Sequence, residues 1–174
     1  YMCGHPGKKL LFMGQEFGQW NEWSEKRALD WYLLEDDSHR ALQEFTKKCL
    51  HLNKEYPCLY ATDYSSEGFR WINVNDKDNS VFSFMRISPD GKKNLLFVLN
   101  VTPVERKKYR VGVPFKTTYK LVLGDDEDNQ KKSIRTAKGD SDGYPQSILV
   151  DLNKYGICVY EFNGDVSKVQ PTKL

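Results

Sequence analysis

The sequence lacks the features that mark several large classes of protein. Its lysines and arginines exceed its acidic residues only enough for a net charge of +2, without the basic excess of nucleic-acid-binding domains. No apolar run approaches the roughly 20 residues of a membrane-spanning helix. The chain begins with tyrosine and has no signal-peptide pattern. We therefore expect no nucleic acid and no membrane as partner, and a chain that is part of a longer polypeptide.

Metal-binding and disulfide patterns are also missing. The four cysteines (Cys3, Cys49, Cys58 and Cys158) form no Cys-x-x-Cys pair and have no zinc spacing with a histidine. Cys49 falls in an apolar helical pattern and Cys158 in an apolar strand, which predicts buried free thiols and a reducing, cytoplasmic location. The acidic run 125–128 lacks the glycine of a calcium-binding loop. We expect neither a metal nor a cofactor.

The richest stretch runs from Lys8 to Trp31. The apolar run Leu10–Met13 ends at Gly14, which predicts a buried strand over residues 8–13, as in a parallel sheet. A polar and aromatic segment follows, and it carries three of the four tryptophans of the chain. In barrel enzymes the residues that follow the C-terminal end of such a strand line the active site.

Four side chains of this segment are candidate binding residues for a carbohydrate: Glu16, Gln19, Trp20 and Trp23. Carboxylates and amides form hydrogen bonds with sugar hydroxyls, and indole faces stack on the apolar faces of pyranose rings. The alternative is that the tryptophans only pack the loop, because buried tryptophan contributes mainly contact area. Glu22 is expected to pair with Arg27 rather than to contact sugar.

The rest of the chain divides into one helix and a series of strands. Apolar residues at intervals of three and four predict a helix from Asp36 to Lys54, capped by Asp37 or Ser38 and stopped by Pro57. From Leu59 the apolar pattern alternates. It predicts strands at 70–74, 81–87, 95–100, 108–111, 118–122, 147–152 and 156–162, with a hairpin turn at Asp90-Gly91. Residues 124–143 are predicted to be an exposed loop and those after Asn163 a frayed tail.

Several motifs resemble one known family. The blocks Leu10–Trp20 and Leu29–Trp31 are similar to the eighth-strand region of bacterial-type glycogen branching enzymes, which belong to the α-amylase superfamily. The resemblance continues in its C-terminal β-domain, through the blocks Gly68–Ile72, Ser80–Phe84, Asn100–Val104 and Tyr109–Pro114. It is clear over residues 8–114 and weak over 147–162. The chain departs from the family at Gly124–Asp126, where an Asn-Ser-Asp triplet is usual.

The resemblance implies a mainly β fold, in which an antiparallel β-sandwich follows the last strand-loop-helix unit of a (β/α)8 barrel. Residues 1–56 would be the barrel part, 57–163 the β-domain and 164–174 a tail. Because a lone parallel strand leaves its edges unpaired, we expect residues 1–34 to be poorly ordered, to rearrange or to associate with another copy of the chain.

The resemblance also implies the chemistry. The intact enzyme would transfer an α-1,4-glucan segment to a 6-hydroxyl, with glycogen or an amylopectin-like glucan as substrate. The nucleophile, the acid/base and the His-Asp pair of this superfamily precede strand eight, and none of the three histidines here is followed by aspartate. The segment Gly68–Ile72 resembles the Gly-x-Arg-x-Asp segment that carries the nucleophile in this superfamily, but Ile72 stands in place of the aspartate. We expect no catalytic residue in this chain, with the missing N-terminal barrel as its partner.

Two alternatives stay open. One is the tail of a related superfamily hydrolase or trehalose-forming enzyme, which the sequence of the upstream barrel would distinguish. The other is a free-standing carbohydrate-binding β-domain, which glucan affinity of this chain alone would favour.

Overall fold

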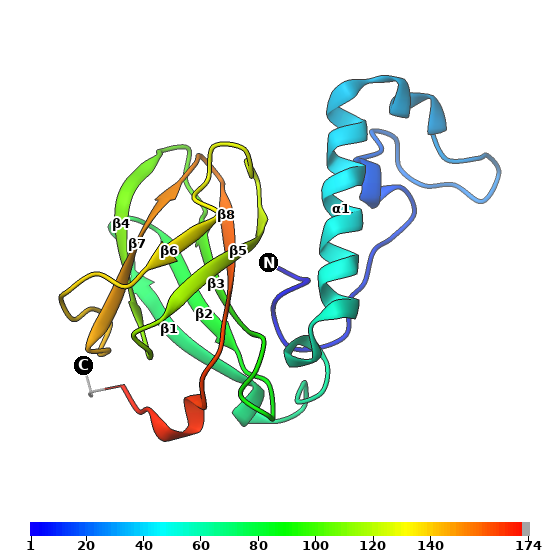
Figure 1. The fold of residues 1–174 in the computed structure, drawn as a ribbon. Helices are drawn as coiled ribbons and strands as arrows, with labels where there is room; N and C mark the ends of the chain where they lie inside the picture. Colours follow the sequence, from blue (N-terminus) through cyan, green and yellow to red (C-terminus); the bar gives the residue numbers. More distant parts are fainter. Residues whose placement is uncertain (172–174) are drawn as a thin grey trace.

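The computed structural model describes residues 1–171 and shows a β-sandwich with a long helix beside it (Figure 1). The helix is α1 (Asp37–Glu55). The strands are β1 (Phe69–Asp76), β2 (Val81–Arg86), β3 (Asn94–Asn100), β4 (Arg106–Val113), β5 (Thr118–Gly124), β6 (Ser133–Arg135), β7 (Gln146–Leu152) and β8 (Ile157–Phe162). Short 3-10 helices are η1 (Gln15–Phe17), η2 (Trp31–Glu35), η3 (Pro57–Leu59), η4 (Ser66–Gly68) and η5 (Val166–Lys168). The mainly β fold expected from the sequence is confirmed.

The strands form two antiparallel sheets. The larger sheet has the order β1-β2-β3-β8-β5-β6, and β4 pairs with β7 in the smaller sheet. The predicted hairpin between β2 and β3 is confirmed: the Gly91 N–H donates to the Ser88 carbonyl at 3.0 Å, and Gly91 has a φ of 68°. Glycine suits this position because left-handed backbone conformations are costly for residues with a Cβ.

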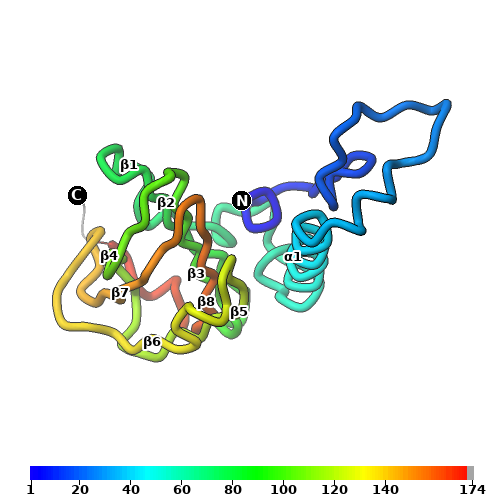
Figure 2. Tube along the Cα trace, turned by 90° about the horizontal axis from the view of Figure 1, so that it is seen from above, coloured from blue at the N-terminus to red at the C-terminus, as the bar shows by residue number. Residues whose placement is uncertain are grey.

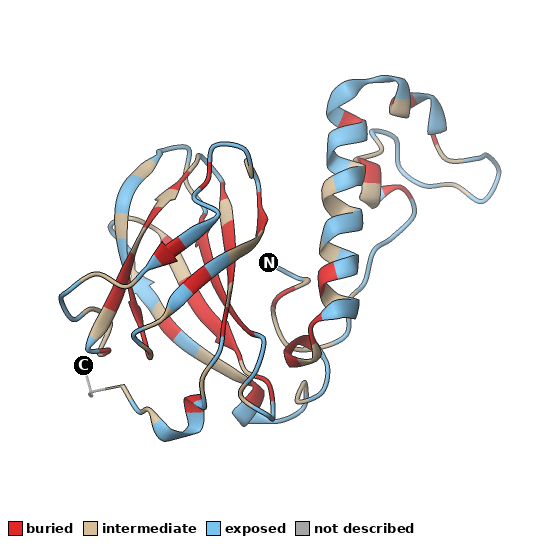
Figure 3. Cartoon of the chain, in the orientation of Figure 1, coloured by how far each residue is buried: buried red, intermediate tan, exposed pale blue. Residues whose placement is uncertain are grey.

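The larger sheet is covered on both faces. One face packs against the smaller sheet around a core that includes Met85, Leu96 and Ile148. The other face carries Phe84 and Phe97, which pack against the end of α1 at Leu52 and against η3. This explains why every residue of β3 is buried, a pattern otherwise typical of strands in parallel sheets. Figure 3 shows buried residues throughout the sandwich, whereas α1 is exposed along most of its length.

The strand predicted at residues 8–13 does not form. Residues 8–13 have no ladder partner among residues 1–171, and Leu10 and Phe12 are exposed. The physical reason is that a parallel strand needs neighbouring strands to satisfy its backbone groups and to cover its side chains. The expectation that residues 1–34 rearrange or associate with another copy of the chain stays a prediction. Figure 2 shows residues 8–35 projecting away from the sandwich beside α1.

The helix begins one residue later than predicted, and Asp36 is its cap. The Asp36 Oδ1 atom accepts a hydrogen bond from the Ser38 N–H at 2.8 Å, which satisfies one of the free amides of the first turn. The hydrogen bonds from the Ser38 hydroxyl and amide lower the pKa of Asp36. At the other end, the Tyr56 hydroxyl donates to Glu161 Oε2 at 2.6 Å and ties the end of the helix to β8.

Two segments are more ordered than the sequence indicates. Residues 124–143 contain β6, which pairs with β5, and Gln130 is buried with its amide donating to Asp125 Oδ1. In the segment predicted to be a frayed tail, Val166 is buried and the Arg70 guanidinium donates to the Val169 carbonyl at 2.6 Å. The last residues of that predicted tail, 172–174, lie outside the described residues. Within residues 1–171 no helix is both long and apolar enough to cross a membrane.

Candidate functional site

The predicted binding residues belong to a loop that folds onto the first turns of α1. We call residues 14–35 the aromatic loop. Phe17 and Leu33 are its buried anchors, and the His39 Nδ1 atom of α1 donates to the Phe17 carbonyl at 2.7 Å. Trp31 packs on Phe17 with ring centroids 5.0 Å apart. The loop is therefore held by packing and hydrogen bonds although no strand precedes it.

The two candidate tryptophans lie on the outside of this loop. Trp20 is 75% exposed and meets the His39 ring at 5.1 Å in an edge-to-face contact. Trp23 is 38% exposed and meets Phe12 at 5.6 Å in the same kind of contact. Exposed tryptophans that are supported from one side present surface to a ligand or to another domain.

The two polar candidates differ in how far they are engaged. Gln19 uses both ends of its side chain within the loop: its Oε1 accepts from the Asp30 N–H at 2.9 Å, and its Nε2 donates to the Asn21 carbonyl at 2.9 Å. Glu16 lies in η1 and is half-buried, and the contacts described for residues 1–171 give its carboxylate no hydrogen bond or ion pair. Of these two side chains, Glu16 is therefore the one whose oxygen atoms can accept hydrogen bonds from a ligand.

Asp30 organises the loop, a role that the sequence reasoning missed. It is buried, accepts from Asn21 Nδ2 at 2.7 Å and lies 3.7 Å from the Arg27 guanidinium. Arg27 in turn donates to the carbonyl oxygen of Glu22 at 2.8 Å. The expected pairing of Glu22 with Arg27 is thus made through the Glu22 backbone and not its carboxylate. The sequence did contain a signal for this role, because Asp30 stands between the apolar residues Leu29 and Trp31. A carboxylate that is buried with such neighbours needs hydrogen-bond or ion-pair partners.

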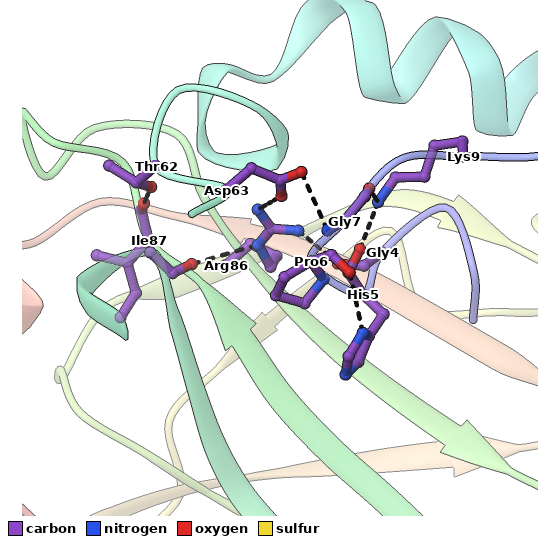
Figure 4. Close-up of polar contacts among 10 residues, drawn as sticks. Gly4, His5, Pro6, Gly7, Lys9, Thr62, Asp63, Arg86 and Ile87 are labelled. Atoms are coloured by element: carbon purple, nitrogen blue, oxygen red, sulfur yellow. Dashed lines mark hydrogen bonds and ion pairs between the residues drawn. The ribbon is translucent and has the colours of Figure 1, made fainter. Parts of the chain in front are cut away.

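A second polar cluster fixes the segment that leads into the aromatic loop. Arg86, at the end of β2, is fully buried and donates to Asp63 Oδ1 at 2.8 Å and to the Gly4 carbonyl at 2.9 Å (Figure 4). Its Nε donates to the Gly68 carbonyl at 3.2 Å. Asp63 Oδ2 accepts from the Gly7 N–H at 3.0 Å. We call Arg86, Asp63, Gly4 and Gly7 the arginine clamp.

The clamp connects the sandwich to the N-terminal turn by charge-assisted hydrogen bonds, which are the stronger kind. Lys9 extends it by donating to the carbonyls of His5 and Gly7 (Figure 4). The sequence signal was an arginine that directly follows the apolar run of β2, but its partner Asp63 lies in a loop 23 residues earlier and no local pattern links the two. Among residues 1–171, no group of three or more histidine, cysteine or acidic side chains is placed to hold a metal ion.

Known proteins are similar to this chain both in the β-sandwich and in the N-terminal part that contains the aromatic loop and α1. The family model for the alpha amylase C-terminal all-beta domain matches residues 71–163, which span β1 to β8 apart from the first residues of β1. A 1,4-alpha-glucan branching enzyme GlgB from Butyrivibrio fibrisolvens is 47% identical over 97% of this chain.

Two further curated relatives have the same name. The protein from Aquifex aeolicus is 51% identical over 66% of this chain, and that from Pseudomonas putida is 38% identical over 91%. The chain spans 27%, 18% and 22% of the lengths of the three relatives, respectively. The similarity covers the aromatic loop as well as the sandwich, since the first match extends over nearly the whole chain.

Proposed function

Because this chain belongs to the family of alpha-amylase C-terminal all-β domains and matches the C-terminal part of bacterial 1,4-alpha-glucan branching enzymes, we propose that it works as part of such an enzyme. The enzyme transfers an α-1,4-glucan segment to a 6-hydroxyl and so forms α-1,6 branches in a glycogen-like substrate. The observation that carries the proposal is that two tryptophans of the aromatic loop, Trp20 and Trp23, are exposed. Each is supported from one side by an aromatic contact, Trp20 by His39 and Trp23 by Phe12.

In this proposal the aromatic loop forms a glucan subsite. Trp20 and Trp23 stack on glucose rings, and Glu16 accepts a hydrogen bond from a sugar hydroxyl. Gln19 acts indirectly, because its amide already holds Asp30 and Asn21 in place. A carbohydrate site combines apolar faces for stacking with a few polar groups, and the aromatic loop carries side chains of both kinds.

The catalytic residues lie on a barrel that this chain does not contain, so the chain is inactive alone. Residues 8–13 pair with the neighbouring strands of that barrel, which accounts for the four apolar side chains they expose. Without those strands the same residues are the site at which copies of this chain associate. We place the division between the barrel part and the β-domain after residue 56, where α1 has ended.

The β-domain stabilises the barrel, and the arginine clamp is the connection. It fixes Gly4 and Gly7 to β2 just before the segment that enters the barrel. The enzyme works in the cytoplasm, in line with four cysteines that form no disulfide. No organic cofactor takes part, since glycosyl transfer with retention relies on two carboxylates.

A native gel that contains glycogen tests the subsite. The chain should migrate more slowly in that gel than in one without glycogen, and Trp20→Ala/Trp23→Ala should remove most of the retardation, because stacking surface is lost. Tyr64→Ala is the matched control: Tyr64 is 84% exposed but lies outside the loop, so its retardation should equal that of the wild type.

Two results would contradict the proposed subsite. Retardation that survives in the double variant would move glucan binding to the sandwich and favour the alternative of a carbohydrate-binding β-domain. A wild-type chain without retardation would leave Trp20 and Trp23 as packing residues for the barrel.

A further inference from the structure

His39 is a buried polar side chain of α1 that lies against the aromatic loop. It is 7% exposed, although its neighbours Ser38 and Arg40 are exposed. Its imidazole makes two contacts with the loop, a hydrogen bond to the Phe17 carbonyl and an aromatic contact with Trp20. One side chain of α1 therefore contacts both the backbone of the loop and one of its candidate stacking residues.

The backbone of the loop approaches His39 closely because residue 18 is glycine. Gly18 has a φ of 70°, and a Cβ there would lie 2.9 Å from Leu42 Cδ2 and 3.7 Å from His39 Nδ1. A larger residue would therefore push the loop away from α1. At this approach the Phe17 carbonyl lies 2.7 Å from His39 Nδ1, and because a carbonyl oxygen only accepts, Nδ1 carries the proton.

The second contact of His39 supports Trp20. The centroids of the imidazole and indole rings are 5.1 Å apart, and the rings meet edge to face at 70°. This is the one aromatic contact of Trp20 within residues 1–171, and Trp20 is otherwise largely exposed. An exposed side chain with few partners populates several rotamers, and ordering it on a ligand costs conformational entropy. A fixed ring against the indole lowers that cost.

We propose that His39 is a positioning residue for glucan binding, which holds the Trp20 indole in the orientation that stacks on a glucose ring. The inference rests on the proposed glucan subsite and deepens it. Because His39 is buried, it does not contact the glucan itself and acts through Trp20. Its hydrogen bond to the Phe17 carbonyl keeps the imidazole in place.

Two substitutions separate the two contacts of His39. In His39→Asn the side-chain amide still donates to the Phe17 carbonyl, but the ring against Trp20 is lost. In His39→Phe the ring remains and the donor is lost. His51→Asn is the matched control, because His51 is exposed on the same helix.

Fluorine NMR of the chain labelled with 5-fluorotryptophan follows each contact separately. The chain has four tryptophans, and replacing each in turn by phenylalanine assigns its resonance. His39→Asn should shift the Trp20 resonance and leave that of Trp31 unchanged. His39→Phe should shift the Trp31 resonance, because Trp31 packs on Phe17, which loses its hydrogen bond. The Trp71 resonance reports whether the sandwich is folded in each variant.

The effect on binding is measured as the apparent Kd for glycogen, from retardation in native gels at increasing glycogen concentration. His39→Asn should raise this Kd about two- to tenfold, the range for loss of one aromatic contact, and His51→Asn should leave it unchanged. In a Trp20→Ala background His39→Asn should have no further effect, because the two residues act as a unit. A purely structural role of His39 would weaken binding equally in both backgrounds.

Failure of this inference and failure of the proposed subsite give different results. A His39→Asn variant that binds glycogen as tightly as the wild type would overturn the positioning role and leave the subsite standing. The same holds if His39→Asn weakens binding by equal factors with and without Trp20. A wild-type chain that glycogen does not retard would contradict the subsite itself, and the positioning role of His39 would fall with it.

Discussion

Replacement of Arg86 by methionine is expected to lower the free energy of unfolding by about 3–5 kcal/mol, the range for removing one partner of a buried ion pair. Arg86 is fully buried, and the Asp63 side chain is only 10% exposed. Methionine fills similar space but leaves the Asp63 carboxylate with a single backbone partner at Gly7. It also leaves the Gly4 carbonyl without the donor that the clamp provides.

Urea denaturation of the chain measures this effect. Arg135→Met is the matched control, because Arg135 is exposed in β6 and the substitution is chemically the same. Its effect should stay within about 0.5 kcal/mol, as is usual for surface positions. Equal midpoints for the two variants would mean that the clamp does not hold the sandwich to the N-terminal turn.

Phe84→Ala should have an effect of similar size, about 3–5 kcal/mol, through lost contact area and a cavity that the rigid sheet cannot close. Phe84 is fully buried and stacks on Phe97, with ring centroids 4.8 Å apart and planes 7° from parallel. Its other neighbours include Phe69 and Trp71 at 5.3 and 5.6 Å.

Phe12→Ala is the control for this second prediction, because Phe12 is half exposed and lies outside the sandwich. Thermal unfolding followed by circular dichroism should show a large drop in midpoint for Phe84→Ala and almost none for Phe12→Ala. A small drop for Phe84→Ala would show that the outer face of the larger sheet contributes little to stability.

The strands were predictable because their apolar patterns and turn residues are local signals. β3, for example, follows the turn at Asp90-Gly91 and is predicted within one residue of its observed start at Asn94. β6 was missed because three residues flanked by charged loops carry too short a pattern. The strand at 8–13 was wrong for the opposite reason: its local pattern is clear, but a parallel strand depends on neighbours that the pattern cannot supply.

The candidate site divides in the same way. The composition of residues 15–23 pointed to Trp20 and Trp23, and the structure places both on an exposed surface. The supporting residues were not predictable, because their contacts join distant parts of the chain: Arg86 binds Gly4 across 82 residues, and His39 binds Phe17 across 22. Polar contacts between residues so far apart in the sequence leave no local pattern from which they could be predicted.

The aromatic loop and the arginine clamp have different roles. The loop presents side chains, and Asp30 and His39 keep it on α1. The clamp fixes the segment before residue 8 to β2. Variants in the loop should therefore change glucan binding, whereas variants in the clamp should change stability first.

The most direct test of the central claim is the branching rate, as a function of glucan concentration, of the full-length branching enzyme that we propose this chain to be part of. Trp20→Ala/Trp23→Ala should raise KM for an amylose substrate about tenfold or more, on the estimate that stacking on two aromatic side chains contributes at least about 1.4 kcal/mol. Tyr64→Ala should leave KM unchanged. An unchanged KM in the double variant, with the enzyme folded and active, would contradict a glucan subsite on the aromatic loop.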